Sequence, residues 1–253
     1  MTNTNTYHSP AIIMRVNEFG ESDLIITCFT PLKGRIKGIA KGARRSKTRF
    51  VNCLNIFSLV NLEYSPGKKG DLYFIHSGKL IEAYPGLRTS YSKLTKASYM
   101  VELTEILFPW ELSDPVMFEI LKRSFKALAD NEAFDMAAEL FEIMAMSQGG
   151  YSINLDKCCI CGRKYTGKGP AVFKPEKGGI ACMKCQQIST MTPRMSPDTV
   201  KLFRCMQSHM FEMLEGEYTP NECVIEIRPV LKLHREYRLE RNPKCISYLE
   251  MTP

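Results

Sequence analysis

The stretch AIIMRVNEFGESDLIITCFTPLKGRIKGIA, residues 11–40, contains three apolar segments separated by two turn-like sequences. Residues 11–19 and 23–30 are rich in Ile and Val, and the GES tripeptide between them has the composition of a turn. The third segment, residues 34–40, follows a PLK tripeptide. We therefore expect three consecutive short β-strands near the start of the chain.

Three further segments continue this pattern, at residues 56–64, 72–76 and 79–83. The first two are separated by the sequence SPGKKG, in which Pro and Gly favour a tight turn. Five or six short strands with Gly-rich turns within about 75 residues predict a small barrel. From the residues alone, an OB-fold and an SH3-like barrel fit almost equally well.

The apolar pattern changes to a helical period after the strands. Apolar residues recur at helical spacing over residues 94–108, and Asp114 followed by Pro115 predicts an N-cap and the first position of a second helix. A third helix is expected from about residue 134, with an end near Gly149 and Gly150. The chain is therefore predicted to belong to the α+β class, with a barrel followed by helices.

Signals of helix starts return in the last quarter of the chain. Ser196, followed by Pro197, predicts an N-cap and a helix that extends to about Leu214. Thr219 has the capping-box spacing to a Glu three residues later. Pro229 should kink the segment that follows or restart it as a new helix.

Charge is distributed unevenly along the chain. The formal net charge of the 253 residues is +7, and residues 33–49 contain eight basic and no acidic residues, so the rest of the chain sums to about −1. This concentration favours a polyanion as partner, most often nucleic acid, over a solvated flexible loop. Residues 102–142 contain ten acidic and three basic residues. We therefore expect nucleic acid to bind mainly at the barrel, with the helices available for protein partners.

The order of residues in the basic segment supports a nucleic-acid face. Basic residues occupy the odd-numbered positions 33, 35, 37 and 41, and apolar residues occupy the even-numbered positions 36, 38 and 40. Because successive side chains of a strand point to opposite faces, this pattern predicts a basic outer face and an apolar face towards the barrel interior. Phe50 is expected to anchor the following loop in the core rather than to stack on a base. The candidate DNA-binding residues are Lys33, Arg35, Lys37, Lys41, Arg44, Arg45, Lys47 and Arg49.

Five of the ten cysteines lie within residues 158–185. Two Cys-x₂-Cys pairs separated by about twenty residues are typical of a tetrathiolate zinc site, and the usual spacings of iron–sulfur clusters differ. Cys159 cannot share a turn with Cys161 as easily as Cys158 can, so Cys158 is the better candidate ligand. A four-cysteine site leaves no open position for substrate, so we expect structural zinc held by Cys158, Cys161, Cys182 and Cys185.

Motifs of catalysis are missing from the sequence. It contains no phosphate-binding loop, dinucleotide fingerprint, zinc-protease motif or nucleophile elbow, and its four histidines are isolated. A non-enzymatic binding protein is therefore favoured; an RNA- or ribosome-directed zinc protein and a metal-dependent nuclease are the alternatives. The N-terminus lacks the pattern of a secretory signal and no apolar run approaches a transmembrane length, so the cytoplasm is the expected compartment.

The N-terminal sequence resembles the RecO family of bacterial recombination mediators. The resemblance begins with RVNEFGESD at residues 15–23 and is most specific in AKGARRSKTRF at residues 40–50. The helical region, the four-cysteine cluster and the EYRL sequence at residues 236–239 follow in the family's order. The resemblance spans about residues 12–249, although residues 228–244 match only loosely.

The resemblance implies a multidomain protein with an N-terminal OB-fold, a helical domain and a four-cysteine zinc-binding module. It implies binding of single- and double-stranded DNA, annealing of complementary strands, and loading of RecA with RecR onto DNA coated by SSB, whose acidic C-terminal tail is a further partner. A protein of this family is expected in the bacterial cytoplasm, associated with the nucleoid. The expected domains are an OB-fold at 1–86, a helical domain at 87–152 and 191–253, and the zinc module at 153–190.

Overall fold

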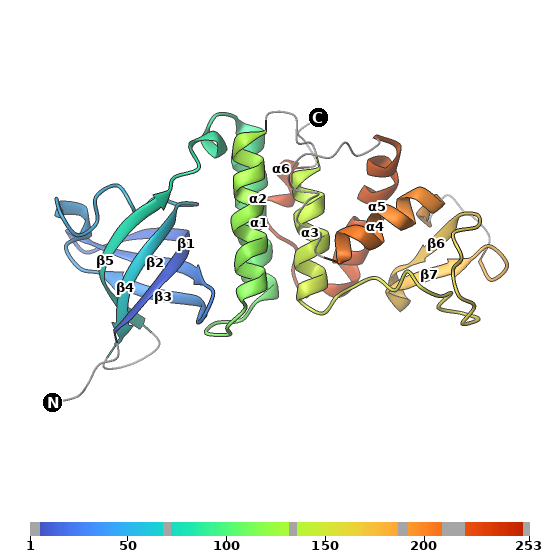
Figure 1. Cartoon of the computed structure of the whole chain (residues 1–253), viewed down its shortest axis with the longest axis horizontal. Helices are drawn as coiled ribbons and strands as arrows, with labels where there is room; N and C mark the ends of the chain where they lie inside the picture. The colour runs from blue at the N-terminus through green and yellow to red at the C-terminus, as the bar shows by residue number, and fades with distance from the viewer. Residues whose placement is uncertain (1–5, 68–71, 132–135, 187–191, 209–220, 250–253) are drawn as a thin grey trace. The chain divides into compact units, whose positions relative to one another are not determined.

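The computed structural model describes residues 6–67, 72–131, 136–186, 192–208 and 221–249 (Figure 1). Contacts divide the chain into two compact units. Residues 1–97 and 108–130 form the first, which we call the barrel unit, and residues 98–107 and 131–253 form the second, which we call the helical unit.

Five strands close into a barrel in the first unit: β1 (Tyr7–Phe19), β2 (Asp23–Thr30), β3 (Gly34–Ala40), β4 (Leu59–Pro66) and β5 (Leu72–Glu82). Their order around the barrel is β1-β2-β3-β5-β4, and β1 closes it by pairing antiparallel with both β2 and β4. The β3–β5 pair is parallel. This order is that of an OB-fold, so the topology resolves the two barrel types that the residues alone left open.

The predicted segments 72–76 and 79–83 form one continuous strand, β5, rather than two. Gly78, which falls where a break was expected, lies inside the ladder, and its N–H donates to the Arg49 carbonyl at 2.9 Å. A Cβ at this position would lie 2.9 Å from the Cys53 Sγ, so the glycine serves close packing instead of a turn. The strand predicted at 56–64 begins later, at Leu59.

Alternating residues of the five strands fill the barrel core, which also takes in Phe50 from the loop after β3. Phe50 is 5% exposed, so the prediction that it anchors this loop in the core is confirmed. The short 3₁₀ helix η1 (Ala43–Arg45) lies between β3 and Phe50.

The barrel unit also contains η2 (Pro85–Arg88), the first part of α1 (Tyr91–Leu107), and α2 (Pro115–Asp130). The predicted N-cap of α2 is present, because the Met117 N–H donates to Asp114 Oδ1 at 2.8 Å. Phe125 of α2 packs edge-on against the rings of Phe57 and Tyr84. Aromatic packing thus joins this helix to the barrel unit's core.

The helical unit contains the end of α1, α3 (Ala137–Gln148), α4 (Pro197–Gln207), α5 (Asn221–Arg238) and α6 (Ile246–Leu249). A small three-stranded sheet, ordered β7-β6-β8, lies within it: β6 (Ala171–Lys174), β7 (Gly179–Cys182) and β8 (Arg194–Met195), with η3 (Pro175–Lys177) between the first two. Ser196 caps α4 as predicted by accepting from the Thr199 N–H. The predicted capping box at Thr219 and the end of α4 near Leu214 lie outside the described residues.

Helix α5 continues through Pro229, so of the two predicted outcomes, a kink or a restart, the restart does not occur. A helical proline removes one backbone hydrogen bond and crowds the preceding turn, which costs about 3 kcal/mol. Ile227 and Val230, on either side of the proline, are both 0% exposed. Burial of the residues around Pro229 therefore offsets its local cost. Among the described residues, no helix combines the length and apolar character needed to cross a membrane.

Candidate nucleic-acid interface and metal centre

Strand β3 separates its basic outer face from the barrel core. Ile36 and Ala40 belong to the core, and a Cβ on Gly38 would lie 2.8 Å from the Ile75 side chain. Lys37, on the opposite face, is exposed. The predicted alternation is therefore confirmed for the inward residues and for this lysine.

Arg35 departs from the prediction of a freely exposed basic face. It is only 8% exposed, because its guanidinium carbon lies 4.0 Å from the centroid of the Trp110 ring. Residue 110 also forms a parallel bridge with residue 35. The alternation could place Arg35 on the outer face, but it gave no sign that a segment 75 residues away would cover it.

Other cations of the segment lie over aromatic rings. The Lys33 Nζ lies 5.0 Å from the centroid of Tyr7, and the Lys41 Nζ lies 5.4 Å from that of Phe74. Cation–π contacts of this kind hold the ammonium groups at the surface while leaving their charge available. Phe74 carried no sequence signal for this position; only the β3–β5 pairing brings it there.

The loop after β3 is held by backbone groups. The Gly42 N–H donates to Asp23 Oδ1 at 2.8 Å, with a φ of +67° that favours glycine. The Arg49 Nη2 donates to the Lys41 carbonyl at 2.7 Å, so both ends of the loop are tied together. Arg44 pairs with Glu18 at 3.1 Å, and the two side chains are 40% and 69% exposed. The loop thus presents its cations on a fixed backbone.

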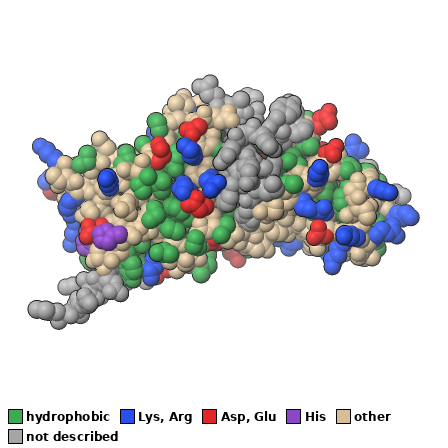
Figure 2. Space-filling model, in the orientation of Figure 1, with side chains coloured by type: hydrophobic (Ala, Val, Ile, Leu, Met, Phe, Trp, Pro, Cys, Tyr) green, Lys and Arg blue, Asp and Glu red, His purple; other side chains and the backbone are tan. Residues whose placement is uncertain are grey.

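The eight predicted DNA-binding residues do not form one compact cluster. Lys33 immediately precedes β3, and Arg35 and Lys37 lie within it. Arg44 and Arg45 lie beside the β1–β2 turn, where Arg45 approaches Glu21 at 3.8 Å. Six of the eight are exposed: Lys37, Lys41, Arg44, Arg45, Lys47 and Arg49. Figure 2 shows Lys and Arg side chains gathered at the barrel end of this view and again over β6 and β7.

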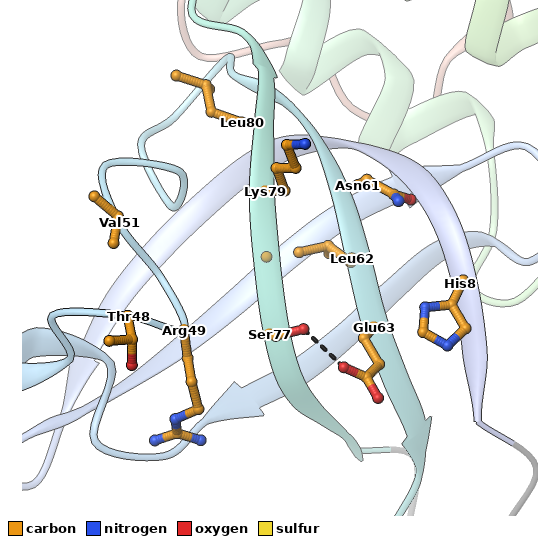
Figure 3. A pocket seen from close by; sticks show the side chains of 11 residues that line it. His8, Thr48, Arg49, Val51, Asn61, Leu62, Glu63, Ser77, Lys79 and Leu80 are labelled. Atoms are coloured by element: carbon orange, nitrogen blue, oxygen red, sulfur yellow. Dashed lines mark hydrogen bonds between the residues drawn. The ribbon is translucent and has the colours of Figure 1, made fainter.

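A cavity of about 670 Å³ opens between this loop and the strands β1, β4 and β5 (Figure 3). Arg49 lies on its loop side and Lys79 on its strand side, and the Ser77 hydroxyl of β5 donates to Glu63 of β4 at 2.7 Å. Lys79 was missed in the sequence, since an isolated lysine in a strand carries no motif. The cavity is lined by His8, Thr48, Arg49, Val51, Asn61, Leu62, Glu63, Ser77, Gly78, Lys79 and Leu80.

The helical unit brings the four predicted cysteines together. The sulfur atoms of Cys158, Cys161, Cys182 and Cys185 all lie within 4.8 Å of one another, and the Cys161–Cys182 separation is 3.9 Å. Four thiolates at Zn–S distances of about 2.3 Å in a tetrahedron would be about 3.8 Å apart. Ligand type and spacing therefore fit a Zn²⁺ ion. Cys159 lies outside the group, and its N–H donates to the Ile180 carbonyl.

Local backbone structure positions each cysteine pair. The first pair sits in a turn closed by the Gly162 N–H donating to the Cys158 carbonyl at 2.9 Å, with Gly162 at a φ of +72°. The second pair begins where β7 ends, and the Cys185 N–H donates to the Cys182 carbonyl at 2.9 Å. Two residues between cysteines let such turns aim both sulfurs at one point.

The electrostatics of this cluster also suit a cation. Burial acts to raise the pKa of Cys158, but backbone N–H groups that donate to its sulfur lower it to about 6. Hydrogen bonding with Cys161 and Cys182 raises the pKa of Cys185 to about 12. Close packing of four thiols thus opposes full ionisation, and a bound divalent cation would remove this opposition.

The comparison with protein families decides what kind of protein this is. The family model described as "Recombination protein O N terminal" matches residues 1–84, and "Recombination protein O C terminal" matches residues 88–245. The chain belongs to the RecO family. The predicted resemblance is therefore confirmed, and the chain is a DNA repair protein of this family.

Relatives of similar length agree with this assignment. The DNA repair protein RecO of Desulfatibacillum aliphaticivorans is 31% identical over 248 residues, which cover 95% of each chain. That of Dehalococcoides mccartyi strain CBDB1 is 27% identical over 250 residues, covering 99% of this chain and 97% of the relative. The RecO protein of Syntrophobacter fumaroxidans is 34% identical over 177 residues, 70% of each chain.

Proposed function

We propose that this RecO family protein is a recombination mediator that binds single- and double-stranded DNA and anneals complementary strands. With RecR it would help to load RecA onto DNA coated by SSB, whose C-terminal tail it would engage. This role places it at the nucleoid in the cytoplasm. The observation that carries the proposal is the ordered, acid-free segment 33–49, with six exposed cations on the barrel and its loop.

Annealing by such a surface needs no chemical step, and we propose that the protein is not an enzyme. Two DNA strands repel each other through their phosphates, and a basic surface that binds both lowers this repulsion. Base pairing then supplies the driving force. Each phosphate neutralised contributes about 0.7–0.9 to the slope of log affinity against log salt, so six contacts would make binding strongly salt-dependent.

The sharpest test is annealing of two complementary strands that have been coated with SSB. The wild-type protein should accelerate annealing, and the triple variant Arg44→Glu, Arg45→Glu, Lys47→Glu should lower the rate towards that without protein. These side chains are exposed, so the variant should keep its fold, which circular dichroism would check. RecA filament formation on SSB-coated DNA, with and without RecR, tests the loading step.

Other results would overturn this proposal in different ways. Equal annealing by the triple variant would show that the basic loop is not the DNA site. Preference for a structured RNA over single-stranded DNA in competition would favour an RNA-directed protein. Cleavage of labelled DNA in the presence of Mg²⁺ or Mn²⁺ would show a nuclease.

We further propose that the four-cysteine group holds one structural zinc ion. The four thiolate ligands supply a complete tetrahedral set, so the metal would organise the two turns and offer no position to substrate. The cluster provides a matched pair of variants, since Cys158 belongs to the group and the adjacent Cys159 does not.

Metal analysis of purified protein should give about one zinc per chain for the wild type and for Cys159→Ser, and much less for Cys158→Ser. Protease digestion should also cleave the Cys158→Ser protein faster within the zinc module. A wild-type protein without zinc, or equal zinc loss in both variants, would refute the proposed ligand set.

A further inference from the structure

The protein's single tryptophan, Trp110, lies against the outer face of the barrel although it belongs to the link between α1 and α2. Its side chain is 50% exposed, which is uncommon for the largest apolar residue. Burial of its ring against the unit's core therefore does not explain its position. The residues around it indicate what an exposed indole could do there.

The backbone holds Trp110 firmly beside β3. Residue 110 bridges residue 35, and the Glu111 N–H donates to the Arg35 carbonyl at 2.9 Å. A Cβ on Gly34 would lie 1.8 Å from the Leu112 carbonyl oxygen, so the close approach of this link requires glycine at the start of β3. Glu111 adopts a φ of +59°, a conformation that costs free energy for a non-glycine residue. Backbone contacts thus hold the main chain of residue 110 beside β3, and the Arg35 guanidinium packs on its ring.

Two basic side chains lie near the indole. The Arg35 guanidinium lies over the ring at 4.0 Å from its centroid, and Lys37 lines the same cavity of about 560 Å³. The remaining lining comes from Ile36, Leu72 and Glu111. An aromatic ring, an aliphatic side chain and a carboxylate suit an uncharged planar group better than a phosphate. Phosphates linked to that group would instead lie towards Lys37, away from the Glu111 carboxylate.

A second aromatic ring continues the same face along β5. Leu72 pairs with Lys37 and Phe74 pairs with Ile39, so the outward residues of β3 and β5 stand side by side. Lys41 lies over the Phe74 ring as Arg35 lies over the Trp110 ring. Positions 35 and 39 on β3 are about 13 Å apart at about 3.3 Å per residue. Two aromatic rings, each in contact with a basic side chain, therefore lie along β3.

We propose that Trp110 is a base-stacking residue for single-stranded DNA, with Lys37 neutralising a phosphate next to the stacked base. This inference rests on the proposed DNA-binding function and adds a residue that lies outside the barrel sequence. Stacking on an aromatic ring is tolerant of sequence, as a mediator of repair requires. It needs an unpaired base, so it distinguishes single strands from duplexes.

The wild-type protein is its own probe, because all of its tryptophan fluorescence comes from this site. Titration with an unlabelled oligothymidylate of about 16 nucleotides, the upper site size of one OB-fold, should quench the emission. The quenching curve should coincide with the binding curve obtained from the anisotropy of the same oligonucleotide carrying a label.

Substitutions then separate stacking from proximity. Trp110→Leu should weaken binding of the single strand by about 5- to 150-fold, as expected for one stacked base, and duplex binding by less than about 3-fold. Trp110→Phe keeps a ring and should stay within about 3-fold of the wild type for both. Tyr91→Leu removes another exposed aromatic, at the start of α1, and should change neither. Unchanged duplex binding also shows that a variant is folded.

The possible failures are distinguishable. Binding without quenching, or quenching with an unchanged affinity of Trp110→Leu, would overturn the stacking role while leaving the proposed DNA-binding function intact. Equal loss of single-strand and duplex binding in Trp110→Leu, with Trp110→Phe also impaired, would assign the indole to barrel structure and overturn stacking. Absence of any DNA binding by the wild type would overturn both proposals.

Discussion

Two arginine-rich segments occur in this chain, and the structure uses them differently. In the barrel unit, residues 33–49 expose six of eight cations. In the helical unit, residues 228–244 contain six Lys and Arg residues, several of which are engaged within the fold. Arg228 pairs with Glu139 at 2.7 Å, and Arg235 pairs with Glu142 at 2.8 Å. Similar charge density is therefore mostly exposed in one segment and partly paired with carboxylates inside the fold in the other.

The difference arises from what packs against each segment. Helix α5 packs against α3, whose acidic residues face it, so cations of α5 meet carboxylates at short distance. On its outer face strand β3 lies beside aromatic residues, and Arg35, the buried arginine of its segment, lies over Trp110. A buried arginine needs a carboxylate or hydrogen bonds to offset its desolvation, whereas an exposed one does not. The residues that pack against an arginine therefore decide whether it is paired inside the fold or left exposed.

The largest expected effect is the loss of stability on substitution of Arg235, whose internal ion pair distinguishes the second segment. Arg235 and Glu142 are 5% and 4% exposed, and the Tyr99 hydroxyl also donates to Glu142 at 2.5 Å. Burial acts to raise the pKa of this carboxyl, and the adjacent guanidinium opposes it. Arg235→Leu would leave the carboxylate buried without its counter-charge, so we expect a loss of about 3–5 kcal/mol of unfolding free energy, measured by urea denaturation.

Two controls accompany this variant. Arg241→Leu removes an exposed arginine of the same segment and should change the stability by less than about 0.5 kcal/mol. Adding Glu142→Leu to Arg235→Leu should recover much of the loss, since no buried charge remains. A loss below about 1 kcal/mol for Arg235→Leu alone would show that this segment does not depend on internal pairing.

His234, next to Arg235 on α5, gives a pH test of the same packing. Its Nε2–H donates to the Tyr151 carbonyl at 2.6 Å, and burial, with a smaller effect of Arg238, lowers its pKa to about 4. The folded state thus keeps the imidazole neutral, while the unfolded state binds a proton below about pH 6.5. Stability should be complete above about pH 6.5 and fall by up to about 3 kcal/mol as pH drops to about 4.

Urea midpoints measured between about pH 4 and pH 7.5 would show this loss. His234→Gln removes the titrating group, so the variant should be less stable at neutral pH but should lose less stability between about pH 6.5 and 4. An identical pH dependence in variant and wild type would assign the acid sensitivity to other groups. The barrel's basic segment, residues 33–49, contains no histidine.

The smallest expected effect concerns DNA binding, for which the same charge change can be made in each of the two segments. Arg44→Glu with Arg45→Glu should lower the salt slope of DNA binding by about 1.5, the share of two phosphate contacts. Arg241→Glu with Lys244→Glu makes the same charge change on exposed residues of the other segment and should leave the slope unchanged. Fluorescence anisotropy between about 50 and 200 mM salt would measure both.

Equal slopes for the two double variants would mean that net charge, not the barrel's arrangement, governs binding. Stability should barely change in either variant, because the ion pairs of Arg44 and Arg45 with Glu18 and Glu21 are largely exposed. A large loss of stability in the barrel variant would instead indicate a structural role for its loop.

Local patterns were sufficient to predict several elements. Alternation of apolar residues located β2 and β3, and the Asp114 and Ser196 caps located the starts of α2 and α4. The two Cys-x₂-Cys pairs identified four sulfurs that the structure indeed brings together. Each of these signals depends on neighbours a few residues apart, which is why the sequence displays it.

Features that depend on distant contacts could not be predicted in this way. Gly78 looks like a break in a strand until its close packing against Cys53 is known. Pro229 looks like the end of a helix until the burial of Ile227 and Val230 offsets its cost. Trp110 looks like one residue of a loop until it meets Arg35.

The sequence by itself determined the barrel's strands, the charge of its basic segment, the cysteine pairs and, through its resemblance, the RecO family. The tertiary structure decided the OB topology, the covering of Arg35, and the pairing of Arg235 with a glutamate 93 residues away. The physical reason is the distance along the sequence between the residues that interact. Strand alternation, caps and metal turns are set by adjacent residues, whereas the environment of a charge is set by whichever segment packs against it.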